Sequence, residues 1–180
     1  MKKVIGFDLE FDSILNQLLN NEISNSLLLS GNKGIGKNYF ITQLIEEYIK
    51  KIIASEHINH HLSLLKNNTH SNIIIVKKEI DEKTKKIKNF ITIDQIRKIN
   101  QFSLETSVIE NIPKFILIDS ADDMNLNASN ALLKILEEPK LNTYFFLISH
   151  QPSSLLPTIK SRCLKVNLSN HNYENFSSIL

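Results

Sequence analysis

The sequence predicts a three-layer α/β fold with a central parallel sheet. Three short apolar runs have the character of strands buried on both faces, and they cover residues 27–30, 115–118 and 144–149. Segments with apolar residues at helical spacing lie between them. A glycine-rich stretch directly follows the first run, and an aspartate follows the second. Because ligands of such sheets bind at the carboxyl edge of the strands, we expect the functional residues there.

The composition is that of one ordinary globular domain. The chain has 180 residues, 42% of them hydrophobic, and a net charge of +2 from 21 basic and 19 acidic side chains. This near balance does not indicate a dedicated nucleic-acid surface. A single cysteine excludes an internal disulfide and a multi-cysteine metal site. With no membrane-length apolar run and no secretory signal, we expect a cytoplasmic protein without membrane contact.

Residues 11–19 are predicted to form the first helix, since apolar side chains recur on one face. The strand 27–30 then leads into the segment 31–37, which has the G-x-x-x-x-G-K spacing of a phosphate-binding loop. Gly31, Gly34 and Gly36 permit backbone N–H groups to converge on a phosphate, and Lys37 supplies a positive charge. Position 38 departs from the pattern, because Asn38 replaces the Ser or Thr hydroxyl that coordinates Mg²⁺. We therefore expect a loop of the right shape without catalytic competence.

Residues 40–52 carry the apolar face of a second helix, and the following stretch contains His57, His60, His61 and His70. We expect these histidines to be exposed rather than to form a metal site. The run to Val76 is a loop and then a strand. The lysine-rich segment 77–88 is interpreted as a charged hairpin tip, with direct DNA contact as the alternative. A helix capped by Asp94 should follow.

The strand 115–118 ends in Asp119 and Ser120, and Asp122 and Asp123 come just after. These last two carboxylates are interpreted as capping charges for the next helix. That helix has one apolar stripe through residues 128–136, begins at Asn125 or Asn127 and is closed by Pro139. A short helix, residues 157–162, has proline in its first turn, so Arg162 at its end should point outwards and Cys163 should be buried.

The segments 130–139 (NALLKILEEP) and 161–163 (SRC) resemble the AAA+ subunits of polymerase clamp loaders. The segments 119–125 (DSADDMN) and 148–152 (ISHQP) narrow the resemblance to the delta-prime family of the bacterial DNA polymerase III clamp loader. The similarity runs from about residue 5 to 168 and implies a three-layer AAA+ P-loop core over residues 1–168. Residues 169–180 would then begin a helical lid, truncated here, and the collar domain of the family would be absent.

The resemblance also assigns roles at the site. Asp119 would hold Mg²⁺, but Ser120 stands where hydrolysing relatives have glutamate, and serine is no general base near neutral pH. Ser149 or His150 would be the sensor below the γ-phosphate. Arg162 would act in trans on ATP bound by a neighbouring subunit, where its planar fork suits phosphate oxygens.

We therefore expect a clamp-loader subunit of the DNA polymerase III (nucleotidyltransferase) holoenzyme without ATPase activity of its own. Its implied partners are the ATPase motor subunit and delta, with the sliding clamp and primed DNA reached through the complex. No metal site and no required cofactor are expected, and ATP or ADP with Mg²⁺ would bind weakly at most. The first alternative is an active P-loop ATPase using Lys37 and Asp119, with Asp122 or Asp123 replacing the glutamate. The second is a repair- or primase-associated paralogue.

Overall fold

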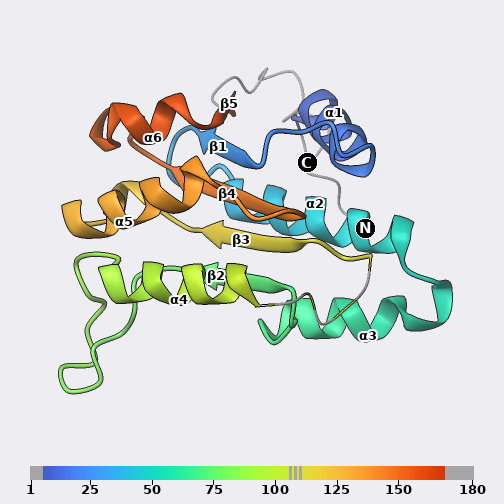
Figure 1. Ribbon diagram of the computed structural model, residues 1–180, viewed down its shortest axis with the longest axis horizontal. Helices are drawn as coiled ribbons and strands as arrows, with labels where there is room; N and C mark the ends of the chain where they lie inside the picture. The colour runs from blue at the N-terminus through green and yellow to red at the C-terminus, as the bar shows by residue number, and fades with distance from the viewer. Residues whose placement is uncertain (1–5, 106, 108, 110, 169–180) are drawn as a thin grey trace, which may run out of the picture.

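The computed structural model describes residues 6–168 except 106, 108 and 110, and it contains a five-stranded, wholly parallel sheet (Figure 1). The spatial order is β2-β3-β4-β1-β5. The strands are β1 (Ser26–Ser30), β2 (Ile73–Val76), β3 (Lys114–Ile118), β4 (Thr143–Ser149) and β5 (Leu164–Asn167). The predicted parallel sheet is confirmed. The predicted lid at 169–180 lies outside the described residues.

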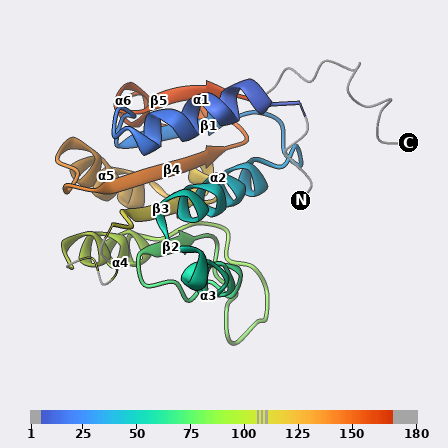
Figure 2. The same cartoon turned by 90° about the vertical axis from the view of Figure 1, so that its right-hand side faces the viewer.

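Helices cover both faces of the sheet, as the three-layer prediction requires (Figure 2). One face carries α1 (Asp8–Leu19), α2 (Lys37–Ile52) and α3 (Ser55–Lys66); the other carries α4 (Ile93–Leu104), α5 (Leu126–Glu137) and α6 (Pro157–Ser161). Successive strand residues point to opposite faces, so Phe115 and Leu117 join the first core while Ile116 and Ile118 join the second. The central residues of β3 are therefore apolar on both sides of the sheet.

The helix starts follow local hydrogen bonding, and one of the predicted caps is wrong. The side chain of Asn125 accepts from the backbone N–H of Ala128 at 2.8 Å, which confirms it as the α5 cap. The cap of α4 is Thr92, not Asp94: Thr92 and Gln95 form a reciprocal capping box. Asp94 instead lies exposed in an ion pair with Arg97. The T-x-x-Q pattern outweighs the single acidic residue because it satisfies two backbone donors.

The β3–α5 connection contains a short 3₁₀ turn, η1 (Ala121–Asp123), which the sequence pattern did not predict. A second such turn, η2 (Pro152–Ser154), precedes α6. Through η1 the residues after Asp119 fold back beside the carboxyl edge of β4, where the backbone N–H of His150 donates to Asp122 at 3.0 Å. The carboxyl ends of β1, β3 and β4 thereby assemble the candidate site.

Candidate functional site

The three glycines of the loop between β1 and α2 all have positive φ, a conformation that residues with a Cβ rarely adopt. Gly36 forms the N-cap of α2 with φ of 88°, a left-handed conformation that is strained for any residue with a Cβ. Gly31 also has a positive φ, 150°, and a Cβ there would lie 2.7 Å from Cδ1 of Ile35, so that this side chain would have to shift. The loop is therefore tightly closed over its first residue.

Lys37, the cation of this loop, is turned inwards. Its side chain is buried, and Nζ donates to the carbonyl oxygens of Gly31 at 2.7 Å and Asn32 at 2.8 Å. Burial lowers the pKa of Lys37, while the nearby Asp122 and Asp119 carboxylates act in the opposite direction. Two of the three donors of the ammonium group are thus used by the loop itself.

Asn38 stands where a phosphate-binding loop normally has the hydroxyl that coordinates magnesium. Its side-chain amide donates to Oδ2 of Asp119 at 3.1 Å, and its backbone carbonyl accepts from the hydroxyl of Thr42 at 3.0 Å. The amide thus joins α2 directly to the carboxylate at the end of β3. Asp119 is brought to the loop as predicted, but its oxygen is engaged by a neutral donor.

Ser120 and His150 form a hydrogen-bonded pair across the ends of β3 and β4. Ser120 Oγ lies 3.0 Å from His150 Nε2, and Ser120 has left-handed backbone angles, φ 65° and ψ 61°. The pKa of His150 is lowered, first by burial and then by the Lys37 cation, against the effect of Asp122 and Asp119. The imidazole is therefore neutral at physiological pH.

This pair does not form a nucleophilic dyad. A catalytic imidazole is oriented by an acceptor at its second nitrogen, but within the described residues His150 Nδ1 is buried with no hydrogen-bond partner. Asp122 is not hydrogen-bonded to that nitrogen; its carboxylate accepts the backbone N–H of His150. Ser149 Oγ is likewise buried without a partner among the described residues. These two polar atoms are where an added water or ligand group would find a hydrogen bond.

Both aspartates of η1 contact other residues. Asp122 contacts His150, and Asp123 forms an ion pair with Lys78, with Oδ2 and Nζ 2.8 Å apart. Their predicted role as capping charges for α5 is also wrong, since both lie on η1 and bind elsewhere. The donor set of this edge does not fit a hydrolytic Mg²⁺–ATP site: Asp119 faces an amide, and a serine stands next to it.

Arg162 is the C-cap of α6, and its side chain lies at the surface without being free. Nη2 contacts Oε1 of Glu137 at 2.7 Å, Nη1 donates to the carbonyl of Thr158 at 2.9 Å, and about 33% of the side chain is exposed. The predicted outward orientation is thus only partly correct, because the guanidinium is held against Glu137 of α5. These two residues are 25 positions apart in the chain. A surface ion pair of this kind is worth about 0–1 kcal/mol, so another anion can replace Glu137 at little cost.

Two of the four histidines contradict the prediction that all are exposed. His57 and His60 are exposed on α3, but His61 and His70 are buried, with Nδ1 of His61 3.2 Å from Nε2 of His70. The backbone N–H of Asn72 donates to Nδ1 of His70 at 3.2 Å. A neutral His70 must therefore donate from Nε2 to His61. Burial lowers the pKa of His70 to about 4 and also lowers that of His61.

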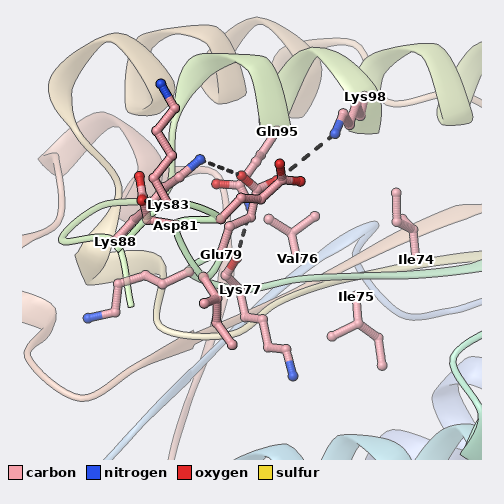
Figure 3. Close-up of a pocket in the computed structure, with 13 residues that line it drawn as sticks. Ile74, Ile75, Val76, Lys77, Glu79, Asp81, Lys83, Lys88, Gln95 and Lys98 are labelled. Carbon is pink, nitrogen blue, oxygen red and sulfur yellow. Dashed lines mark hydrogen bonds and ion pairs between the residues drawn. The ribbon is translucent and has the colours of Figure 1, made fainter. Parts of the chain in front are cut away.

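One surface hollow adjoins the nucleotide site, and a larger one lies elsewhere. One of about 340 Å³ adjoins Asn38 and Asp119, while a larger one, about 1010 Å³, lies between β2, the following loop and α4 (Figure 3). Over residues 6–168, leaving out 106, 108 and 110, no group of three or more His, Cys, Asp or Glu side chains is placed to hold a metal ion. In the same residues no helix has the length and apolarity needed to cross a membrane.

The fold and the nucleotide-site layout define the class of protein. Solved structures of AAA+ type superimpose on nearly the whole chain. A gamma-subunit-related DNA polymerase III protein of Thermotoga maritima gives a TM-score of 0.67 at 22% identity, over 90% of this chain and 46% of that one. The RuvB Holliday junction branch migration motor of the same organism gives 0.56 at 16% identity, over 97% and 49%. At these identities the likeness establishes the fold: an AAA+ P-loop core.

Sequence comparison then identifies the family. The family described as "DNA polymerase III, delta subunit" matches residues 10–172. DNA polymerase III subunit delta' of Pseudomonas aeruginosa is 37% identical over 149 residues, which is 79% of this chain and 42% of the relative. The Haemophilus influenzae subunit delta' is 44% identical over 84 residues, 47% of this chain and 25% of that protein. The chain belongs to the DNA polymerase III delta-prime family of clamp-loader subunits, and it spans less than half the length of these relatives.

Proposed function

We propose that this chain serves in DNA replication as a clamp-loader subunit that does not hydrolyse ATP and presents Arg162 to ATP bound by a neighbouring subunit. The observation that carries the first part is the pair Ser120–His150. Where hydrolysis needs a carboxylate to activate water, the chain has a hydroxyl hydrogen-bonded to a neutral imidazole. The Asn38–Asp119 contact supports the same conclusion at the metal position.

The surface position of Arg162 supports the second part. The guanidinium has five N–H donors in a planar fork, and the contacts with Glu137 and Thr158 engage its two terminal nitrogens. A triphosphate of a neighbouring subunit offers more negative charge than one carboxylate. The arginine would therefore exchange Glu137 for phosphate oxygens when the neighbour docks.

The proposed partners are an ATPase motor subunit and delta, with the sliding clamp and primed DNA reached through the assembly in the cytoplasm. A loader reconstituted with Arg162→Ala tests the role of Arg162. We expect assembly to persist and the ATPase rate of the complex to fall by about 10³-fold or more, as for other cations supplied in trans. Arg97→Ala is the matched control, since the chain's other arginine is exposed and also paired with a carboxylate.

Unchanged ATPase activity and clamp loading in a correctly assembled Arg162→Ala complex would exclude the role in trans. Arg162→Lys should behave like Arg162→Ala rather than like the wild type, because lysine keeps the charge but loses the fork. If neither variant changes the ATPase rate of the complex while the wild-type chain still joins it, the chain is a loader subunit but Arg162 has no catalytic role.

We also propose that the chain requires no nucleotide and binds ATP or ADP weakly at most. The inward-turned Lys37 supports this, because its ammonium group is satisfied by carbonyl oxygens of the loop. Calorimetric titration with ATP, once in Mg²⁺ and once in EDTA, measures the affinity for the nucleotide and its dependence on the metal. Tight Mg²⁺-dependent binding that Lys37→Ala abolishes would favour the alternative of an active P-loop ATPase.

A further inference from the structure

The segment between β2 and α4 forms a projecting arm, of which Lys77 at the base adjoins the hollow beside Asn38 and Asp119. We call residues 77–91 the hairpin arm; Figure 1 shows it in green, extending beyond the helical layers. Ile80 and Ile87 face each other in an antiparallel bridge, and the backbone N–H of Asp81 donates to the carbonyl of Lys86 at 2.8 Å. The tip is closed by the Asp81 carboxylate, which accepts the backbone N–H of Thr84 at 2.7 Å.

The base of the hairpin arm is fixed to the core at two places. The side chain of Gln95 on α4 donates to the carbonyl of Lys77 at 2.8 Å, as Figure 3 shows with a dashed line. Lys78 pairs with Asp123 of η1, and the backbone N–H of Ile91 donates to the carbonyl of the same aspartate at 2.8 Å. Binding a partner would therefore cost little conformational entropy, because the base of the arm is already held in place.

Large apolar side chains are exposed on the hairpin arm. Ile80 is 62% exposed, Ile87 66% and Phe90 55%. The two isoleucines are a non-hydrogen-bonded pair, so their side chains stand close together on one face of the hairpin. Ile87 and Phe90 also line one shallow depression of about 470 Å³. Exposed apolar groups gathered on one arm are typical of a contact surface.

The charge left on the hairpin arm is positive. The arm has six lysines against three acidic residues, Glu79, Asp81 and Glu82. Glu79 pairs with Lys88 and lies 4.0 Å from Lys98, and the Asp81 carboxylate accepts backbone N–H groups within the tip. Among the described residues, by contrast, the side chains of three tip lysines form no ion pair or hydrogen bond; these are Lys83, Lys85 and Lys86. The arm that carries the apolar pair therefore has an excess of positive charge.

We propose that the hairpin arm docks on another protein of the same assembly, at an apolar pocket bordered by carboxylates. The isoleucine pair fills the pocket, and the tip lysines meet the acidic rim, where such charges mainly set the association rate. A nucleic acid fits less well, because a phosphate backbone satisfies the lysines but covers neither isoleucine. This inference rests on the proposed function, which supplies the assembly.

The test uses the full chain reconstituted with the motor subunit, delta and the sliding clamp. Ile80→Ser combined with Ile87→Ser should weaken the affinity of the chain for the assembly by about 30-fold, as loss of a central apolar anchor does. Leu141→Ser is the matched control, because Leu141 is also exposed but lies between α5 and β4, and it should leave the affinity unchanged. Thermal unfolding of each variant verifies that the fold is intact.

A photoreactive benzoylphenylalanine at position 87 then identifies what the arm touches in the wild-type background. A cross-link to a protein subunit of the assembly, lost when that subunit's acidic rim is neutralised, supports the proposal. A cross-link to primed DNA, or an intact assembly whose affinity the isoleucine variants do not change, overturns it. A wild-type chain that joins none of the subunits overturns the proposed function itself, and this inference with it.

Discussion

The side-chain amide of Asn38 donates to the carboxylate of Asp119 at 3.1 Å, joining the start of α2 to the end of β3. In a hydrolytic P-loop site a hydroxyl and a carboxylate at these places share a magnesium ion. Here the two residues contact each other directly. Their hydrogen bond therefore links two secondary-structure elements at this position.

The variant Asn38→Thr should make nucleotide binding more dependent on Mg²⁺. A hydroxyl at position 38 frees Asp119 from its amide donor and adds a hard oxygen ligand, so we expect ATP affinity to become stronger in Mg²⁺ than in EDTA. Turnover should stay absent because Ser120 is unchanged. Isothermal titration with both solutions measures the difference; equal affinities in the two would show that other groups exclude the ion.

Lys114 is predicted to stabilise the C-terminal end of α4. It is buried, Nζ donates to the carbonyls of Phe102 and Glu105, and the ammonium group lies 4.8 Å from the centre of the Phe102 ring. Lys114→Met leaves both carbonyls without this cation, and we expect the free energy of unfolding in urea to fall by about 2–4 kcal/mol. Lys51→Met, at an exposed position of α2, should change it by less than about 0.5 kcal/mol.

Stability should decrease as the pH falls from about 6.5 towards 4. The pKa of His70 in the folded chain is about 4, below the ordinary value of 6.5, so the unfolded chain binds more protons in this window and acid favours unfolding. The stabilisation is complete above pH 6.5 and amounts to about 3 kcal/mol over the window. His70→Gln should flatten the pH dependence of urea unfolding, whereas His57→Gln, at an exposed site, should preserve it. Equal slopes for the wild type and His70→Gln would refute this assignment.

Cys163 should be unreactive in the folded chain. It is buried, and burial raises the pKa of its thiol to about 11, so little thiolate exists at pH 8. We expect reaction with a disulfide reagent to be roughly 100-fold slower in buffer than in denaturant, where the thiol has its ordinary pKa. Rapid labelling of the folded protein would mean that β5 opens from the sheet edge.

Local sequence patterns predicted most of the fold, but they did not predict the contacts between residues far apart in the chain. The apolar strands and the glycine spacing at 31–36 each depend on one continuous segment, and the structure confirms both. The partners of Arg162 and His61 depend on how α5 meets α6 and how α3 meets the start of β2. Single-segment periodicity contains no information about such pairs. The cap at Thr92 is different, since the T-x-x-Q pattern was present and the acidic Asp94 was given too much weight.

The inward position of Lys37 has a consequence for how this motif is inherited. Its ammonium group holds the carbonyls of Gly31 and Asn32 together, so Lys37 contributes directly to the shape of the turn. Substitutions at the glycines or the lysine would then be removed by selection for folding alone. The residues of a nucleotide-binding signature can therefore be under selection for the fold itself, separately from any ligand.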